Sequence, residues 1–200
     1  MKLVLATKNK DKIKEIKNKL SVIDSIELLS LEDFDNAPNV IEDGISFQEN
    51  AIKKAQAISA FTGLPALADD SGLCVDALDG RPGVLSARYA GENTADTERN
   101  MKLLDEMNGK TDRSAKFVCA VTCCLLDGTL LSVTGECQGL IAERPSGTMG
   151  FGYDPVFFLP EYGCTMAEIP LEEKNKISHR ALALEKTAAL LAEIVGHKKP

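Results

Sequence analysis

The sequence predicts an α/β fold, read as one domain over residues 1–200 with a mixed β-sheet. Three observations carry this prediction. The chain opens with a buried strand, a turn and an amphipathic helix. Strand-like runs then alternate with helical patterns, and one aspartate-glycine turn between apolar runs indicates an antiparallel hairpin. No linker rich in proline, glycine or serine and no internal repeat divides the chain.

The first half predicts strands at residues 2–6, 25–31 and 66–68 and helices from Asp11 and from Ser46. Ile13, Ile16 and Leu20 form the apolar stripe of the first helix. Residues 32–44 read as a loop. Ser46 and Glu49 form a capping box, which predicts the start of the second helix. The helix runs to about residue 62, because Gly63-Leu64-Pro65 is a C-terminal signal. The third strand leads directly into Asp69-Asp70-Ser71-Gly72.

The second half predicts a turn-rich segment at residues 79–83, a helix over 94–108 and a buried strand over 115–126. That strand pairs with residues 129–136 across Asp127-Gly128, a type I′ hairpin signal. Further strands are expected at 139–142 and 156–158, separated by a glycine-rich loop at 147–154. The last helix runs from Ser178 to about Val195.

Composition excludes several classes of protein. The chain is 44% hydrophobic and 26% charged, with a formal net charge of −7, which disfavours nucleic acid or an anionic membrane as a partner. No segment reaches the roughly 18 apolar residues of a membrane helix. The N-terminal apolar run is also too short for a signal peptide. Six cysteines without a C-x-x-C pair and only two histidines argue against zinc and predict a cytoplasmic protein.

The first candidate motif is Thr7-x-Asn9-x-x-Lys12, at a strand-to-helix junction. Backbone N–H groups and the positive end of the helix dipole favour a phosphate there, and Lys12 adds charge. The alternative is a capped, solvated, lysine-rich helix.

The second candidate is Asp69-Asp70-Ser71-Gly72. Adjacent carboxylates suit Mg²⁺, which takes one or two of them together with substrate phosphates. Consecutive strand residues point to opposite sides, so one acid can be structural. Glu42 or Glu49 offers a further carboxylate, and Lys53 or Lys54 an inward-turned cation. The alternative is an ordinary turn.

Two further motifs suit a flat, polar ligand. In Gly150-Phe151-Gly152-Tyr153-Asp154, glycines flank an aromatic ring on which a base can stack, and Asp154 can accept hydrogen bonds. The alternative is a tight turn with a buried phenylalanine. His179 and Arg180 follow Ser178 in the first turn of the last helix, where cations oppose the dipole, and this mismatch indicates function. The four motifs together favour a nucleoside triphosphate.

The same motifs resemble the inosine triphosphate pyrophosphatase family, and the likeness runs along nearly the whole chain. It rests on six segments in order: 7–12, 46–51, 68–73, 86–89, 151–155 and 178–180. The resemblance implies a two-lobed α/β structure with a long mixed β-sheet flanked by helices and an active site between the lobes. It also implies a homodimer that requires Mg²⁺ and hydrolyses non-standard purine triphosphates to a monophosphate and pyrophosphate.

Roles carried over by the resemblance are expectations for this chain. Asp70 is the general base and, with Glu42, binds the metal. The triphosphate is held by the segment Thr7, Lys8, Asn9, Lys10, Asp11 and Lys12, and Ser71 contacts the substrate. Lys8 stands where the family often has glycine. The base is gripped by Phe151, Gly152, Tyr153, Asp154, Lys174, His179 and Arg180.

The expected mechanism is attack of a water, oriented and deprotonated by Asp70, on the α-phosphorus. Magnesium bridges phosphate oxygens and carboxylates, and Lys12 and Lys54 offset the charge of the leaving pyrophosphate. Cationic donors such as Lys174 and Arg180 favour a 6-oxo base, so ITP, dITP and XTP are expected ahead of ATP. Guanine must be excluded at its 2-amino group, where a buried donor without an acceptor costs roughly 1–3 kcal/mol.

Three other functions remain open from the sequence. They are a pyrophosphatase for pyrimidine or modified nucleotides, a nucleotide sensor that does not hydrolyse, and a structural domain with coincidental motifs.

Overall fold

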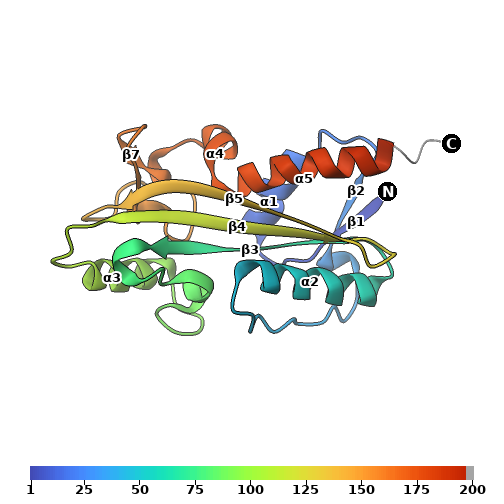
Figure 1. The fold of residues 1–200 in the computed structure, drawn as a ribbon, viewed down its shortest axis with the longest axis horizontal. Helices are drawn as coiled ribbons and strands as arrows, with labels where there is room; N and C mark the ends of the chain where they lie inside the picture. The colour runs from blue at the N-terminus through green and yellow to red at the C-terminus, as the bar shows by residue number, and fades with distance from the viewer. Residues whose placement is uncertain (197–200) are drawn as a thin grey trace. The chain divides into compact units, whose positions relative to one another are not determined.

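A computed structural model describes residues 1–196, and its seven strands form one sheet in the order β2-β1-β3-β4-β5-β6-β7 (Figure 1). Contacts divide the chain into two units. Unit 1 comprises Met1–Asp70, Cys119–Gly135 and the chain from Arg180, and unit 2 comprises Ser71–Val118 and Glu136–His179. Strands β3, β4 and β5 each contribute residues to both units.

Unit 1 begins with a parallel arrangement of strands. Strand β1 (Lys2–Leu5) pairs in parallel with β2 (Glu27–Ser30) on one side and with the start of β3 (Ala66–Val75) on the other. The helices are α1 (Lys10–Leu20), α2 (Phe47–Thr62) and α5 (His179–Gly196). Strand–helix alternation of this kind requires crossovers, and α1 and α2 supply them.

Alternation along β1 divides unit 1 into two cores. Leu3 and Leu5 pack with residues of α1 and α5, whereas Val4 packs with Ala55 and Ile58 of α2. Helices α1 and α5 therefore cover one face of the sheet and α2 covers the other (Figure 1). Because both faces are covered, residues 3–5 of β1 are buried on both sides of the sheet, which is the usual condition of a central parallel strand.

Unit 2 adds antiparallel strands and one larger helix. It holds α3 (Asp96–Glu106), the start of β4 (Ser114–Cys124) and the end of β5 (Leu130–Ile141). The chain then passes through β6 (Phe157–Leu159), β7 (Cys164–Thr165) and α4 (Leu171–Ile177). Strand β6 is antiparallel to β5 and to β7. One core joins these elements, including Leu73, Leu103, Met107, Phe117, Tyr153, Phe157 and Met166.

The predicted mixed sheet and α/β class are confirmed, with differences in four elements. Strand β3 does not end at residue 68 but continues through Asp69-Asp70-Ser71-Gly72, because this stretch is buried in the sheet. Residues 139–142 are not a separate strand, since β5 runs unbroken to Ile141. Strand β7 and helix α4 were not predicted, because each is too short to show a period.

Two local details also differ from the prediction. The hairpin between β4 and β5 exists, but its turn is not type I′, since only Gly128 has a positive φ, of 85°. The Gly128 N–H bonds to the carbonyl of Leu125, which places the glycine at the left-handed position after an ordinary turn. At α2, Ser46 does accept from the N–H of Glu49, but the Glu49 carboxylate reaches back to Ile45.

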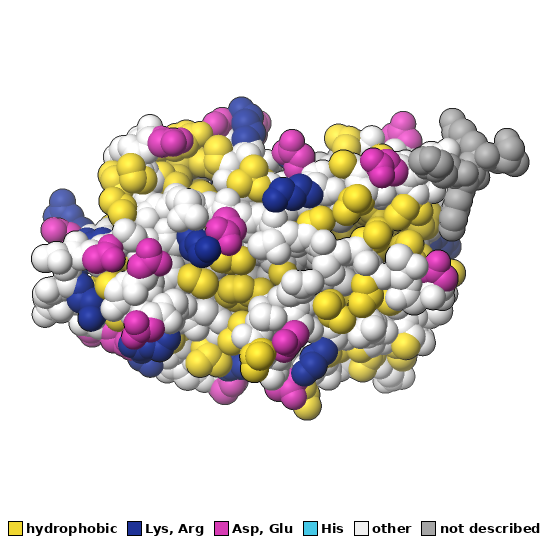
Figure 2. Space-filling model, viewed as in Figure 1, with side chains coloured by type: hydrophobic (Ala, Val, Ile, Leu, Met, Phe, Trp, Pro, Cys, Tyr) yellow, Lys and Arg dark blue, Asp and Glu magenta, His cyan; other side chains and the backbone are white. Residues whose placement is uncertain are grey.

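The surface carries mixed charge. On the face drawn in Figure 2, lysine and arginine side chains lie among acidic and hydrophobic ones and form no continuous basic area. In the described part of the chain, no helix combines the length and the apolar character needed to cross a membrane.

Candidate functional site

Asp69 and Asp70 connect the buried polar side chains of unit 1, because each contacts several of them. Both lie inside β3 rather than after it, and both are buried, with 1% and 8% of their surface exposed. As neighbours on a strand they point to opposite faces of the sheet. Their partners confirm this: Asp69 contacts residues of α1 and α5, and Asp70 contacts residues of α2.

Asp69 belongs to a buried chain of ion pairs. Its Oδ2 accepts from Lys12 Nζ at 2.9 Å and from Arg180 Nε at 3.1 Å. The other side of the guanidinium, Nη1, donates to Glu15 Oε2 at 2.6 Å. Arg180 is 2% exposed and Glu15 is 6% exposed, so the charges are compensated within the protein. Oδ1 of Asp69 has no hydrogen-bond partner among the described residues.

The pKa values follow from this network. Burial acts to raise the pKa of Asp69, but the nearby charges of Lys12, Arg180 and Lys54 outweigh it and hold that pKa well below its ordinary value. Burial acts to lower the pKa of Arg180, and Asp69 and Glu15 raise it instead. Asp69 is therefore an ionised carboxylate that fixes two cations, rather than a group that exchanges protons.

Asp70 has a different environment on the α2 side. Its Oδ2 accepts from Asn50 Nδ2 at 2.9 Å, and its Oδ1 lies 3.8 Å from Lys54 Nζ. The same ammonium lies 2.8 Å from Glu42 Oε2. Burial raises the pKa of Asp70 above its ordinary value, although Lys54 and the Asn50 hydrogen bond act in the other direction. A carboxylate with a raised pKa is better suited to accept a proton than its neighbour Asp69.

Lys54 links the two carboxylates that were predicted to bind metal. Burial acts to lower its pKa, but Asp70, Asp69 and Glu42 raise it, so the ammonium stays charged. Glu42 and Asp70 both approach one cation, and both supply the oxygen atoms that Mg²⁺ prefers. Two carboxylates fit an ion that takes its remaining ligands from water and phosphates. No group of three or more His, Cys, Asp or Glu residues within 1–196 is arranged to hold a metal by itself.

The segment predicted to hold phosphates caps helix α1. The Asn9 side chain accepts from the N–H groups of Asp11 and Lys12, and Thr7 Oγ1 accepts from the Asn9 N–H. Asn9 therefore caps α1, so two of the first N–H groups of the helix have a side-chain partner, and phosphate binding by this segment stays a prediction. Lys8, Lys10 and Asp11 are exposed on this end of the helix.

The predicted base-binding loop lies in unit 2 and is organised by Asp154. Its Oδ2 accepts from the Phe151 N–H at 3.0 Å and from Lys174 Nζ at 2.6 Å. Lys174 also lies over the Phe151 ring, 4.6 Å from its centroid. A Cβ on Gly150 would lie 2.1 Å from Asp154 Oδ2, so only glycine fits there. The structure thus brings three predicted residues, Phe151, Asp154 and Lys174, into one cluster.

Helix α3 holds this loop through two residues that the sequence did not single out. Asp96 accepts from the Gly152 N–H, and Asn100 donates to the Gly152 carbonyl at 3.1 Å. The two side chains are one helical turn apart, so they meet both backbone groups of one residue. Gly152 has a φ of 65°, a conformation that L side chains rarely adopt. Next to it, the buried Tyr153 hydroxyl donates to the Ser86 carbonyl.

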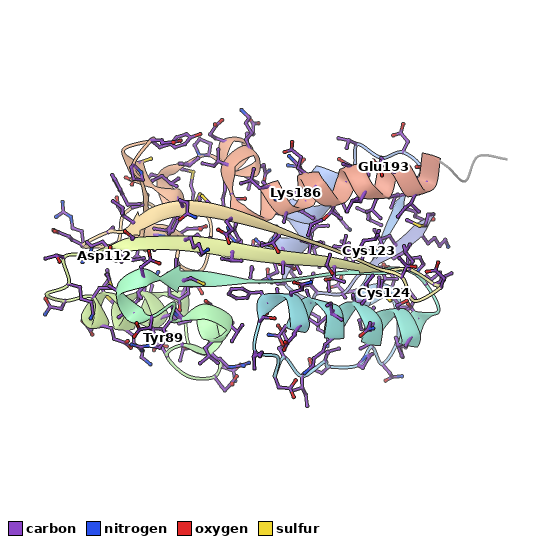
Figure 3. All side chains as sticks on the ribbon, viewed as in Figure 1. Tyr89, Asp112, Cys123, Cys124, Lys186 and Glu193 are labelled. Atoms are coloured by element: carbon purple, nitrogen blue, oxygen red, sulfur yellow. The ribbon has the colours of Figure 1, made fainter. Side chains whose placement is uncertain are left out.

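Residues 86–89, part of the family likeness, connect to α3 as well. The hydroxyl of Tyr89, labelled in Figure 3, donates to Glu106 at 2.7 Å, and Lys102 lies over its ring. Burial and the Glu106 hydrogen bond raise the pKa of Tyr89 to about 12. This tyrosine therefore stays neutral at physiological pH and anchors its segment.

His179 and Arg180 were expected together at the base, and the structure gives them different surroundings. The His179 ring stacks on Phe117 in unit 2, with centroids 4.6 Å apart. Arg180, the next residue, forms the ion pairs with Asp69 and Glu15 in unit 1. Ser71 is half-buried at the first position of unit 2.

All six cysteines are free thiols. Cys123 and Cys124, near the end of β4 in Figure 3, belong to the two opposite cores of unit 1. The Cys119 thiol donates to Asp69 Oδ2, with 3.9 Å between Sγ and Oδ2, and burial raises the pKa of Cys119 to about 12. These thiols pack as small apolar groups.

Comparison with known proteins adds an independent result. A family model described as the Ham1 family matches residues 3–190. The chain is 52% identical over 199 residues to a "dITP/XTP pyrophosphatase" of Geobacter sulfurreducens, covering 98% of this chain and 96% of the relative. It is 51% identical to a protein of the same name from Geobacillus kaustophilus, covering 98% and 97%.

Solved structures agree with these matches. A HAM1 protein from Coxiella burnetii superposes with a TM-score of 0.90 at 42% identity, covering 96% of this chain and 99% of the other. The Ham1 protein of Staphylococcus aureus gives a TM-score of 0.89 at 38% identity, covering 97% and 100%.

Proposed function

The chain belongs to the Ham1 family, and from this membership we propose that it hydrolyses non-standard purine nucleoside triphosphates. The substrates are ITP, dITP and XTP, and the products are the nucleoside monophosphate and pyrophosphate. The structural observation that best supports a hydrolytic role is the environment of Asp70, a buried carboxylate with a raised pKa between Asn50 and Lys54. Relatives named dITP/XTP pyrophosphatase, aligned over nearly their full length, support the choice of substrate.

Asp70 is proposed as the general base. It accepts a proton from water while the water oxygen forms a bond to the α-phosphorus. The bond from that phosphorus to the oxygen bridging the α- and β-phosphates breaks, and the electron pair leaves with pyrophosphate. General bases of this kind contribute typically about 10²–10⁴-fold to a rate. Lys54 remains charged beside Asp70 and stabilises the negative charge that develops.

The metal is proposed to be Mg²⁺, held by Glu42 and Asp70. When bound, Mg²⁺ would polarise the phosphate oxygens and neutralise their charge. The chain's own contribution is to keep the two carboxylates close, which Lys54 does by contacting both.

Lys12 is proposed to contact the triphosphate. Its side chain is 17% exposed, and its ammonium holds Asp69 with one of three possible hydrogen bonds. The buried pair with Asp69 fixes the direction of the lysine before a substrate arrives. Arg180 is proposed to contribute to this positioning, because the carboxylates of Asp69 and Glu15 both pair with its guanidinium.

The base is proposed to be recognised in unit 2. The Phe151 ring supplies a surface for stacking, and Lys174 is the cationic donor for a 6-oxo group. Asp154 orients that donor through a hydrogen bond of 2.6 Å. An adenine, which has an amino donor at the same position, would place two donors against each other.

The proposal also includes a homodimeric assembly and a cytoplasmic location. The family resemblance favours a homodimer. The six free thiols fit the reducing cytoplasm, where nucleotide pools are used.

The test is a panel of triphosphates with separate detection of pyrophosphate and orthophosphate, in Mg²⁺ and after chelation. The proposal expects dITP, ITP and XTP to release pyrophosphate well ahead of dATP and dGTP, and chelation to stop the reaction. Preference for a pyrimidine triphosphate would favour the rival pyrophosphatase. Binding of dITP without turnover would favour a sensor, and no binding at all would favour a structural domain.

A further inference from the structure

Asn50 connects the candidate base to the loop that carries the candidate metal ligand. Its Nδ2 donates to Asp70 Oδ2 at 2.9 Å, and its Oδ1 accepts from the Gly44 N–H at 2.8 Å. The residue is 1% exposed. We propose that Asn50 is a positioning residue: with Gly44, it sets the orientation of the Asp70 carboxylate. This inference rests on the proposed function, because it assigns Asp70 the role of base.

Helix α2 explains why one side chain reaches both partners. Asn50 and Lys54 are one turn apart and face the same side. Each contacts Asp70 and each contacts the loop before the helix, Lys54 through Glu42 and Asn50 through Gly44. The helix therefore holds Asp70 and the 42–44 segment in a fixed relation through two parallel bridges.

The chemistry of the amide determines its direction. The Gly44 N–H is a donor and the Asp70 carboxylate is an acceptor, so only one orientation of the amide satisfies both. An aspartate at position 50 could accept from Gly44, but it could not donate to Asp70. A leucine of similar size could do neither. Asparagine is thus chemically matched to this pair of partners.

Gly44 gives an independent steric argument. A Cβ built on it would lie 2.7 Å from Asn50 Oδ1 and 2.9 Å from Glu49 Cβ. Gly44 is not among the residues with a positive φ, so its backbone conformation is open to alanine. The glycine is therefore required by the close approach of Asn50, and Gly44→Ala should displace the amide that holds Asp70.

Displacement of Asp70 should lower turnover more than substrate affinity. The Asn50 amide bonds to Asp70 Oδ2 and to the Gly44 N–H. The proposed function gives Asn50 no contact with the phosphates or the base, so its loss should act on the position of Asp70 rather than on substrate binding. A misplacement of about 1 Å at a reacting group can cost about 100-fold in rate. Loss of a group that orients a metal-binding side chain costs about 10–100-fold.

The kinetic test compares Asn50→Asp and Asn50→Leu with Gln56→Ala, which removes an exposed amide from the same helix. With dITP and saturating Mg²⁺, we expect kcat to fall about 10–100-fold in both Asn50 variants while KM changes less than threefold. Gly44→Ala should give a similar loss, and Gly196→Ala, at a glycine with nothing within 4 Å of the added Cβ, should not. In the double variant G44A/N50L, the loss should be close to that of N50L alone.

A second readout uses the protein without metal or nucleotide. The side-chain amide of Asn50 should give a hydrogen-bonded proton signal in ¹⁵N NMR spectra that exchanges slowly with water. Asp70→Ala and Gly44→Ala should both shift that signal, and Gln56→Ala should leave it unchanged. Circular dichroism of each variant establishes that it is folded before its rates are compared.

The outcomes separate this inference from the proposed function. Wild-type kcat in folded Asn50→Leu, or an Asn50 amide signal unaffected by Asp70→Ala, would overturn the positioning role while leaving the activity intact. A loss confined to KM would overturn it too, because it would indicate contact with substrate. Absence of dITP hydrolysis in the wild type would refute the proposed function, and the NMR result would still report on the Asn50–Asp70 contact.

Discussion

The two units bury charge in different ways. In unit 1, Asp69, Arg180, Glu15 and Lys12 form a chain of four alternating charges that joins a strand to two helices. In unit 2, Lys174 and Asp154 form a buried pair, and side chains of α3 hold the base loop as well: Asn100 donates to the Gly152 carbonyl, and Asp96 accepts from the Gly152 N–H. Asp69 of unit 1 is thus held by a network of several ions, whereas the base loop of unit 2 combines a buried ion pair with hydrogen bonds from α3 to Gly152.

This difference indicates which part of substrate binding each unit is suited to, the phosphates or the base. A phosphate-handling site must hold several charged side chains in place before the substrate binds, and a compensated network does this without leaving a charge unpaired. A base-reading site needs a flat surface and a few directed donors, and small residues allow both. Variants should therefore change rate and stability in unit 1, and selectivity in unit 2.

The largest effect is expected from Asp70→Asn in unit 1. The variant keeps the size of the side chain but cannot accept a proton, so kcat for dITP should fall about 10²–10⁴-fold. Its affinity for the triphosphate, measured by calorimetry with a non-hydrolysable analogue, should change little. Unchanged turnover would reject Asp70 as the base. It would also contradict the assignment of catalysis to unit 1 and of base selectivity to unit 2.

Asp69→Asn should affect stability more than Asp154→Asn. Removing the Asp69 charge leaves both Lys12 and Arg180 without their shared carboxylate, and breaking such a buried pair costs about 3–5 kcal/mol. Asp154→Asn leaves one cation, Lys174, and should cost less. Urea unfolding at pH 7 measures both. Equal losses would mean that the longer network adds nothing.

The pH dependence of stability sharpens the same comparison. The pKa of Asp69 is lower in the folded protein than in the unfolded chain, so the unfolded state binds more protons as the solution is acidified. Its contribution to stability is complete above the unfolded pKa of about 4 and is lost as the pH falls below it. Asp69→Asn should therefore flatten the decline in unfolding free energy between pH 5 and pH 3, as urea titrations can determine. A variant that declines as steeply as the wild type would contradict this assignment.

Asn100→Ala should alter selectivity through the loop of unit 2. It removes the hydrogen bond to the Gly152 carbonyl, so Phe151 and Asp154 lose part of their support. We expect the preference for dITP over dGTP, taken as a ratio of kcat/KM values, to fall about tenfold, which corresponds to one hydrogen bond of about 1.4 kcal/mol. Thr97→Ala, at an exposed position of the same helix, is the control. An equal loss of rate for all substrates would indicate a general structural role.

The smallest effect is expected at the surface of unit 2. Lys116 and Glu136 pair at 2.9 Å between β4 and β5, and both side chains are more than a third exposed. Exposed pairs contribute about 0–1 kcal/mol, so Lys116→Ala should change the unfolding free energy by less than about 1 kcal/mol. Thermal denaturation in low and high salt measures it. A larger, salt-independent loss would mean that surface pairs matter here as much as buried ones.

The sequence predicted the fold well where a pattern was long. Helices α1, α2 and α5 have apolar stripes or caps, and the order of strands and helices follows from their alternation. It failed at β3, because Asp-Asp-Ser-Gly has the composition of a turn. Its burial depends on partners that lie far away in the chain, such as Lys12 and Arg180. Local composition could not reveal that compensation.

The candidate site was predicted only in part, again because the role of a residue depends on partners that lie far away in the chain. Phe151, Asp154 and Lys174 were named and lie together, whereas Asn50 and Asn100 were not given roles. Asn50 lies in segment 46–51 of the family resemblance, but the role of an amide within a helix depends on the groups that it faces, which the sequence does not show. One signal was available: the cation at position 180, in the first turn of α5, breaks a local rule of helix stability, and there it completes the network of Asp69.

Hydrolysis of dITP in ¹⁸O-labelled water tests most directly whether the site around Asp70 and Glu42 directs water to the α-phosphorus. Mass spectrometry of the products then locates the label. Incorporation of one ¹⁸O atom into dIMP, with unlabelled pyrophosphate, is the predicted result. Label in pyrophosphate or in orthophosphate would place the attack on another phosphorus and contradict the mechanism.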